Sequence, residues 1–119
     1  MYNSKYIEKC VAFSLVIGLT LFFVMQANAQ SGIASIYSGQ RTANGEYAHA
    51  HRMTAAHRSL PFGTRVQVTN HRNGRSVVVR INDRGPYISG RVIDLTPAAA
   101  DALGFSGLTS VTLLVLEQD

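Results

Sequence analysis

The sequence has 119 residues, a formal net charge of +4 and a single cysteine. A chain of this length forms one small domain with one hydrophobic core and leaves no room for a second domain. The cysteine, Cys10, lies near the start, so no disulfide can hold the rest of the chain together. We therefore expect a closed β-sheet, because closure leaves few exposed strand edges.

Residues 1–29 are typical of a secretory signal peptide. Lys5 and Lys9 precede an uncharged apolar run over residues 11–25, and Ala27 and Ala29 form a small-x-small cleavage site. The run is shorter than the ~20 residues of a membrane-spanning helix, although an uncleaved anchor is the alternative. Because Cys10 precedes this run, we expect no lipid-anchored cysteine at the cut. We expect residues 30–119 to be one exported domain of the periplasm or cell envelope, with no stable membrane anchor after cleavage.

The rest of the chain predicts a mainly β fold with short elements. Alternating or continuous apolar residues predict strands at 32–37, 64–69, 75–82, 91–95 and 111–117, whereas residues 54–57 fit either a strand or half a helical turn. Turns are indicated by the Asn-Gly pairs at 44–45 and 73–74. A short helix is predicted at 98–103, with Thr96 as N-cap, Pro97 at its first position and Gly104 as C-cap. These elements indicate a small β-barrel of about six strands with one or two short helices.

Residues 30–119 are basic, with nine arginines, no lysine and six carboxylates. A basic exported domain can meet nucleic acid, anionic lipid or the anionic polymers of a cell envelope. Export makes nucleic acid the least favoured of these partners, and we expect none.

The stretch over residues 76–104 carries two aspartates at the ends of apolar strands, Asp83 and Asp94, and we interpret it as the wall of an active-site groove. Of the other carboxylates, Asp101 is expected on the exposed side of the helix, and residues 117 and 119 lie at the C-terminal end. Glu46 follows a turn, which presents it on a loop. Each candidate has a simpler explanation: exposure for Glu46, turn stabilisation for Asp83, and binding of backbone amides or an arginine for Asp94, which we favour over catalysis.

Cleavage of a polysaccharide requires a carboxylic acid that protonates the leaving oxygen, and glycosidases use two carboxyl groups at defined separations. Glu46 and Asp83 would meet this need if their two turns lie at the same mouth of a barrel. Tyr47 and Tyr87 follow these carboxylates closely and are candidates to stack on a sugar ring, whereas Phe62 is expected in the core.

The histidines do not form a recognisable metal site. His49 and His51 alternate, but neither a cysteine nor an HExxH pattern accompanies them. We interpret these two and His71 as loop residues and expect no metal and no cofactor. His57 differs, because it lies among small residues where its ring can hydrogen-bond a carboxylate or a sugar. Phe105, like Phe62, is expected in the core.

An ordered series of motifs resembles the rare lipoprotein A family. The motifs are GxAS at 32–35, TANGE at 42–46, TAAH at 54–57, LPFGT at 60–64, VTN at 68–70, NGR at 73–75, VRINDRGP at 79–86 and IDL at 93–95. The resemblance extends over about residues 32–116. It implies a double-psi β-barrel and a septal-ring lytic transglycosylase, which cleaves the β-1,4 bond between N-acetylmuramic acid and N-acetylglucosamine and closes the muramyl 6-hydroxyl onto the anomeric carbon.

The same resemblance implies catalytic roles for Glu46, His57 and Asp83. One carboxylate would act as general acid and then general base, and the other, with His57, would stabilise the oxocarbenium-like charge; their roles are left open. Substrate-binding candidates are Asp94, which resembles a glycan-binding aspartate of expansins, and Arg84, Tyr47, Tyr87 and Asn44. The expected partner is peptidoglycan, bound by a monomer. Alternatives are a non-catalytic, expansin-like glycan-binding module and a basic domain that binds envelope polyanions.

Overall fold

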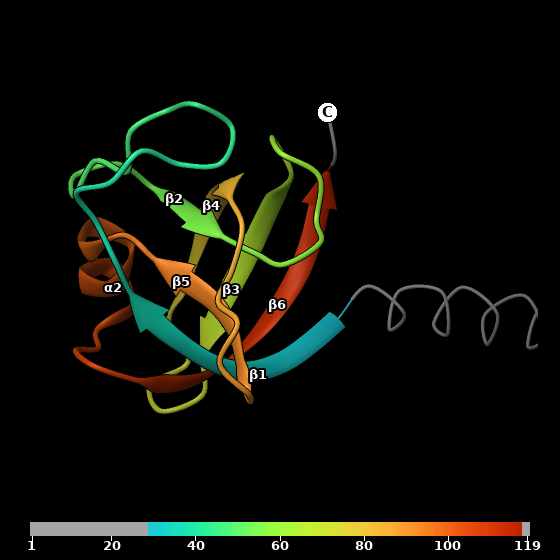
Figure 1. Ribbon diagram of the computed structural model, residues 1–119. Helices are drawn as coiled ribbons and strands as arrows, with labels where there is room; N and C mark the ends of the chain where they lie inside the picture. The colour runs from blue at the N-terminus through green and yellow to red at the C-terminus, as the bar shows by residue number, and fades with distance from the viewer. Residues whose placement is uncertain (1–28, 118–119) are drawn as a thin grey trace, which may run out of the picture.

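Six strands form a closed barrel in the computed structural model, which describes residues 29–117 (Figure 1). Around the barrel the order is β1-β5-β2-β4-β3-β6. The predicted six-stranded barrel is confirmed, with a single short helix in the described residues. The predicted signal peptide lies outside these residues, except for Ala29.

The strand bounds follow the predicted pattern closely. The strands are β1 (Ala29–Ile36), β2 (Thr54–Ala56), β3 (Arg65–Asn70), β4 (Ser76–Asp83), β5 (Arg91–Leu95) and β6 (Thr109–Glu117). β1 begins earlier than predicted because its first three residues pair with residues 112–114 of β6. Residues 54–56 are a strand, which decides between the two alternatives for that segment.

Two parallel pairings interleave in the barrel: β1 runs parallel to β5, and β2 runs parallel to β4. β2 also pairs antiparallel with β5, so it is hydrogen-bonded on both sides. In this register Ala56 faces Asp83 on one side and Asp94 on the other. Two aspartates from separate strands are thereby placed on either side of one short strand.

The core of the barrel consists mainly of branched aliphatic side chains, and β1 and β2 contribute alanines to it. Its members include Val66, Val79, Ile81, Ile93 and Leu113. Phe105 packs against this core as predicted. The same prediction for Phe62 is wrong: its ring is 36% exposed and lies beneath the guanidinium of Arg84, 4.0 Å from its centroid.

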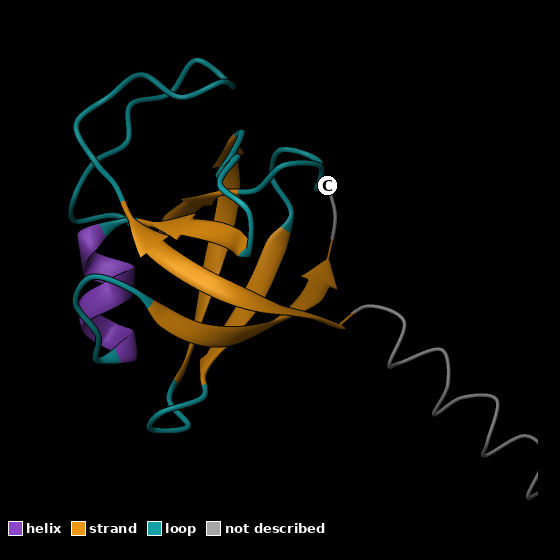
Figure 2. Ribbon diagram, turned by 60° about the horizontal axis from the view of Figure 1, so that its bottom comes forward, coloured by secondary structure: helices purple, strands orange, loops and turns teal. Residues whose placement is uncertain are grey.

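The helix, α2 (Pro97–Leu103), packs beside one end of the barrel (Figure 2). Gly104 ends it with φ 77°, and a Cβ there would lie 2.8 Å from a side-chain nitrogen of Arg75. Thr96 is the N-cap residue as predicted, but its hydroxyl donates to the carbonyl of Arg52 and accepts no hydrogen bond from a helix amide. In the described part of the chain no helix has the length and apolar character needed to cross a membrane.

Candidate functional site

The long loop between β1 and β2 brings the two candidate turns together above the ends of β2 and β4 (Figure 1). The loop folds back on itself, with the Gly39 amide donating to the Ala48 carbonyl at 2.9 Å. It then docks on β4: the amide of Ala43 donates to Asp83 Oδ1 at 2.8 Å, and the amide of Asn44 donates to the Asn82 carbonyl at 3.3 Å. The turn that carries Glu46 and the strand end that carries Asp83 are therefore adjacent.

Glu46 is held as an ion by its neighbours. Arg80 Nη2 donates to both carboxylate oxygens, at 2.9 and 3.0 Å, and Asn44 Nδ2 donates to Oε1 at 2.9 Å. The hydrogen bond from Asn44, followed by those from Arg80 and Asn82, holds the pKa of the Glu46 carboxyl below its usual range despite some desolvation. Glu46 is thus a fixed negative charge at neutral pH and a poor proton donor.

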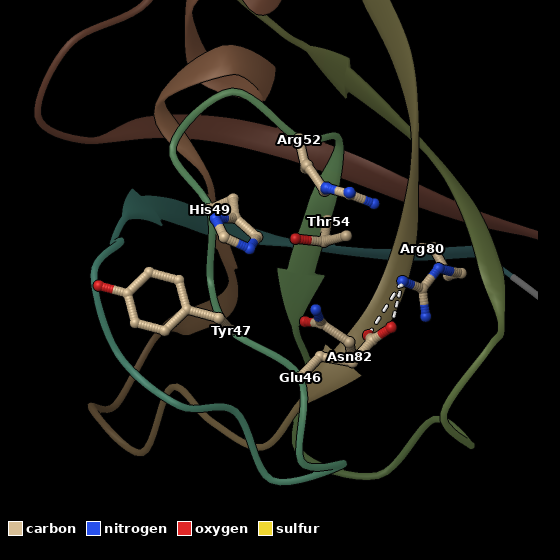
Figure 3. A pocket seen from close by; sticks show the side chains of 7 residues that line it. All are labelled: Glu46, Tyr47, His49, Arg52, Thr54, Arg80 and Asn82. Atoms are coloured by element: carbon tan, nitrogen blue, oxygen red, sulfur yellow. Dashed lines mark hydrogen bonds and ion pairs between the residues drawn. The ribbon is translucent and has the colours of Figure 1, made fainter.

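A pocket of about 200 Å³ opens beside this ion pair (Figure 3). Its lining comes from the loop and from the ends of β2 and β4, namely Glu46, Tyr47, His49, Arg52, Thr54, Arg80 and Asn82. Tyr47 is half-exposed and its ring centroid lies 4.9 Å from that of His49. The pocket is polar, and its lining includes one carboxylate, two guanidinium groups and the ring of a tyrosine.

Asp83 is buried at the end of β4, with one oxygen committed and the other nearly free. Oδ1 accepts the amides of Ala43 and Arg84, both at 2.8 Å. Oδ2 has only a 3.5 Å contact with Gln40 Nε2. Backbone amides therefore fix the position of the carboxyl group while Oδ2 remains available to carry or accept a proton.

His57 uses both ring nitrogens inside the protein. Nδ1 accepts the amides of Ser59 and Leu60, each at 3.1 Å, so the proton of the neutral ring lies on Nε2, which donates to Gln30 Oε1 at 2.9 Å. Burial, followed by the charges of Arg58 and Arg84, lowers the pKa of His57. Its backbone amide donates to the Asp83 carbonyl at 3.1 Å, so in this structure His57 supports the Asp83 strand end through its backbone and its ring contacts no carboxylate.

Asp94 lies on the far side of β2 and accepts a hydrogen bond from the Ser35 hydroxyl. The hydroxyl of Tyr37 is buried and has no hydrogen-bond partner among the described residues. Burial, followed by the negative charges of Asp83 and Asp94, raises the pKa of Tyr37. The Tyr37 hydroxyl therefore interacts electrostatically with both aspartates. The sequence predicted a backbone amide or an arginine as the partner of Asp94, whereas the structure shows the Ser35 hydroxyl.

The other substrate-binding candidates do not all lie in the pocket, and two of them hold neighbouring residues in place. Arg84 Nη1 donates to the carbonyls of Leu60 and His57, at 2.8 and 3.3 Å, so this guanidinium braces the turn after β2. Asn44 bonds to Glu46 and orients it. Tyr87 is 74% exposed on the loop after β4 and is not part of the pocket.

Sequence reasoning did not identify Tyr37, Thr54, Arg80 or Asn82 as site residues. Arg80 was detectable in part, because a charged residue interrupts a run of valines and isoleucine at 77–81. Its partner was not, since Glu46 lies 34 positions away in the sequence. Within residues 29–117, no three His, Cys, Asp or Glu side chains cluster in a way that could hold a metal ion.

Comparison with known proteins places this geometry in context. The family model described as lytic transglycolase matches residues 29–114. A probable endolytic peptidoglycan transglycosylase RlpA of Synechocystis sp. is 58% identical over 94 residues, which are 74% of this chain and 29% of the relative. The corresponding protein of Yersinia pestis is 52% identical over 89 residues, 71% of this chain and 25% of the relative. The chain thus spans between a quarter and a third of the length of these relatives.

Solved structures share the barrel. The Streptomyces papain inhibitor superposes with a TM-score of 0.62 at 23% identity, covering 75% of this chain and 94% of the inhibitor. An expansin of Clavibacter michiganensis superposes with a TM-score of 0.60 at 26% identity, covering 76% of this chain and 52% of the expansin. A mutant of that expansin in complex with cellohexaose gives a TM-score of 0.59 at 25% identity, covering 76% of this chain and 52% of the mutant.

Proposed function

Because the chain belongs to the lytic transglycolase family of double-psi β-barrel proteins, we propose that it is an endolytic lytic transglycosylase that cleaves peptidoglycan glycan strands in the cell envelope. The curated relatives with the same barrel segment bear the name endolytic peptidoglycan transglycosylase. The observation that carries the proposal is Asp83, a buried carboxylate with one oxygen fixed by two backbone amides and the other nearly free, next to the turn of Glu46.

The geometry favours one division of roles between the two carboxylates. Glu46 is held ionised by Asn44 and Arg80, so it suits stabilisation of positive charge that develops at the anomeric carbon. Asp83 is the proton carrier, because its Oδ2 accepts no strong hydrogen bond from the protein. His57 acts through position, since its backbone amide binds the Asp83 carbonyl and its neutral ring fixes the turn that follows.

The reaction then runs in two proton transfers without water. Protonated Asp83 gives its proton to the glycosidic oxygen, and the bond between the muramyl C1 and that oxygen breaks with its electron pair leaving on the oxygen. The resulting oxocarbenium-like carbon faces the Glu46 charge. Asp83, now ionised, takes the proton of the muramyl 6-hydroxyl as the new bond from O6 to C1 forms. The products are a free 4-hydroxyl end and a 1,6-anhydro end, and Asp83 regains its proton.

Purified sacculi test the proposal through the masses of soluble products. The expected result is release of 1,6-anhydro muropeptides by the unmodified chain, with loss of release in Asp83→Asn. The asparagine keeps an oxygen for the two backbone amides, so the fold should persist, and Asp101→Asn on the exposed side of α2 is the matched control. Products heavier by one water would show a hydrolase and overturn the lyase assignment.

A non-catalytic glycan-binding module is the second candidate, favoured by the superposition on an expansin whose mutant binds cellohexaose. The same sacculi distinguish it. Binding without release of any soluble muropeptide, unchanged in Asp83→Asn, would support the module and contradict the enzyme.

Export to the periplasm or cell envelope forms part of the proposal, supported by the leader-like pattern of residues 1–29. Mass spectrometry of the protein recovered from the periplasm should find a chain that begins at Gln30. Recovery of the intact chain from the cytoplasm alone would contradict it.

A further inference from the structure

Two buried polar atoms without partners line the same pocket. Thr54 is 5% exposed and Asn82 is 1% exposed, and neither Thr54 Oγ1 nor Asn82 Oδ1 has a hydrogen-bond partner among the described residues. Both residues line the pocket beside Glu46 (Figure 3). Buried polar groups are normally hydrogen-bonded, because leaving one unpaired destabilises the fold. Two such atoms at one opening indicate partners that a ligand supplies.

The strand register explains why these two side chains meet. Thr54 of β2 is the cross-strand partner of Arg80 of β4, so their side chains project from the same face. Asn82 lies two residues beyond Arg80 and shares that face. The register shifts between Ala55 and Ala56, so Asn82 itself has no partner on β2. Asn82, the unpaired residue, is part of the pocket lining.

The chemistry of the two unpartnered atoms differs. Asn82 Oδ1 is an amide oxygen and can only accept a hydrogen bond, whereas Thr54 Oγ1 is a hydroxyl oxygen and can also donate. Glu46 and Arg80 compensate each other's charge across 2.9 Å, and Arg52 adds a further positive charge to the lining.

We propose that this pocket is a subsite for the acetamido group of an N-acetylated hexosamine in a glycan strand. Asn82 Oδ1 accepts the acetamido N–H, and Thr54 Oγ1 donates to the acetamido carbonyl. A secondary amide has one donor and one acceptor, which matches this pair of atoms. The half-exposed ring of Tyr47 closes one side against the sugar. At about 200 Å³ the pocket is smaller than the ~300–1,000 Å³ of sites for drug-sized ligands, so it accepts one substituent or ring and not a chain.

This inference rests on the proposed function for the class of polymer, but it is tested by binding alone. The probes are the β-1,4-linked hexamer of N-acetylglucosamine, its fully de-N-acetylated counterpart and cellohexaose, titrated by calorimetry. Asp83→Asn serves as the background, so that turnover cannot consume a probe. The N-acetylated hexamer should bind at least about tenfold more tightly than cellohexaose, a factor that corresponds to one good hydrogen bond pair.

Thr54→Val is the decisive variant because it has the same shape and removes only an unpaired hydroxyl, so its thermal stability should be unchanged or higher. It should lose most of the preference for the N-acetylated hexamer, as should Asn82→Ala if that variant folds. Thr69→Val, which removes a hydroxyl bonded to Ser76 on the outside of β3, is the matched control and should keep the preference.

Equal affinity for the three hexamers, or an undiminished preference in Thr54→Val, would overturn the subsite. The subsite and the proposed function fail separately. A preference that depends on Thr54, in a chain that releases no anhydro product from sacculi, keeps the subsite and rejects the enzyme. Release of anhydro product by a chain without any preference does the reverse.

Discussion

Asp83 and Asp94 face each other across a single residue of β2, because both are cross-strand partners of Ala56. Neighbouring strands lie about 4.8 Å apart, so the backbones of the two aspartates are about 10 Å apart. Tyr37, just beyond the end of β1, directs a buried hydroxyl into the field of both carboxylates. The surroundings of Asp83, the proposed proton carrier, therefore include a phenol and a third carboxylate in addition to Glu46.

Tyr37→Phe should lower activity without lowering stability. The hydroxyl has no hydrogen-bond partner among residues 29–117, so its removal leaves no new unpaired group, and the free energy of unfolding should change by less than about 0.5 kcal/mol. The phenol can donate a hydrogen bond to the Asp83 carboxylate during the reaction. We therefore expect kcat on sacculi to fall about tenfold, or ~1.4 kcal/mol.

The control for this prediction is Tyr87→Phe, which removes the same hydroxyl from an exposed ring on the loop after β4. It should leave kcat on sacculi unchanged. A purely structural role of Tyr37 would appear as a loss of thermal stability that accompanies the loss of activity, and that result would reject a role in positioning.

His57 should make the stability of the protein depend on pH just below neutrality. Its pKa is lowered in the folded protein by burial and by two arginines, while in the unfolded chain it stays near 6.5. As the pH falls below about 6.5, His57 binds a proton in the unfolded chain but stays neutral in the folded protein, so the free energy of unfolding decreases as the pH falls. Above that pH His57 is neutral in both states, and it no longer lowers the free energy of unfolding.

Urea unfolding between pH 5 and 8 measures this effect. His57→Asn keeps a side-chain acceptor for the amides of Ser59 and Leu60 but removes the titrating ring, so the decrease below about pH 6.5 should disappear. His71→Asn, on the exposed β3–β4 turn, should retain the decrease. Glu46 does not interfere with this measurement. Its pKa is lowered from an already acidic value, so it changes the free energy of unfolding only below about pH 4.5.

Glu46→Gln should reduce cleavage strongly while changing stability little. The Glu46–Arg80 pair is partly exposed, with 44% and 37% of the side-chain surfaces accessible, and exposed pairs contribute less than about 1 kcal/mol. Without the carboxylate the charge that develops on the sugar is no longer stabilised, so we expect kcat on sacculi to fall about 100-fold.

A matched control is available on the neighbouring strand. Arg65 of β3 is the cross-strand partner of Arg80 and forms an ion pair of its own with Glu117. Glu117→Gln breaks the Arg65–Glu117 pair at 3.3 Å, which has a similar exposed geometry away from the pocket. Both variants should change the free energy of unfolding by a similar small amount, and only Glu46→Gln should lose activity. Equal activity in the two variants would remove Glu46 from the reaction.

Local pattern was enough to predict most of the elements. The valine-rich run of β4, the Asn-Gly turns and the Pro97 and Gly104 ends of α2 are all specified by neighbouring residues, and each appears where expected. Thr96 is the N-cap residue as the local pattern predicts, but the bond from its hydroxyl to the carbonyl of Arg52 is a tertiary contact that no local pattern specifies. Phe62 was misassigned because its ring packs under the guanidinium of Arg84, a contact between residues distant in sequence, and not against the core.

The site was predictable only where motifs marked it, because its geometry depends on contacts distant in sequence. Asp83 and Asp94 become neighbours through the pairing of β2 with both β4 and β5, which no local pattern specifies. The unpaired atoms of Thr54 and Asn82 arise from a register shift in the sheet. Such features follow from topology, so they become visible only when the strands are placed side by side.

Gly32→Ala should destabilise the barrel through a single contact. A Cβ at this position of β1 would lie 2.3 Å from Cγ1 of the buried Val92 on β5, which is far inside van der Waals contact. The strand must shift or the valine must leave its rotamer, at a cost of about 1–3 kcal/mol in the free energy of unfolding.

Val92→Ala removes the methyl groups that clash, so a double-mutant cycle tests the mechanism. Val92→Ala alone should destabilise the barrel by leaving space in its core. The combination with Gly32→Ala should be more stable than the sum of the two single changes by at least about 1 kcal/mol, measured by chemical unfolding. Additive effects would show that the alanine acts through the backbone of β1 or its pairing with β6, and not through Val92.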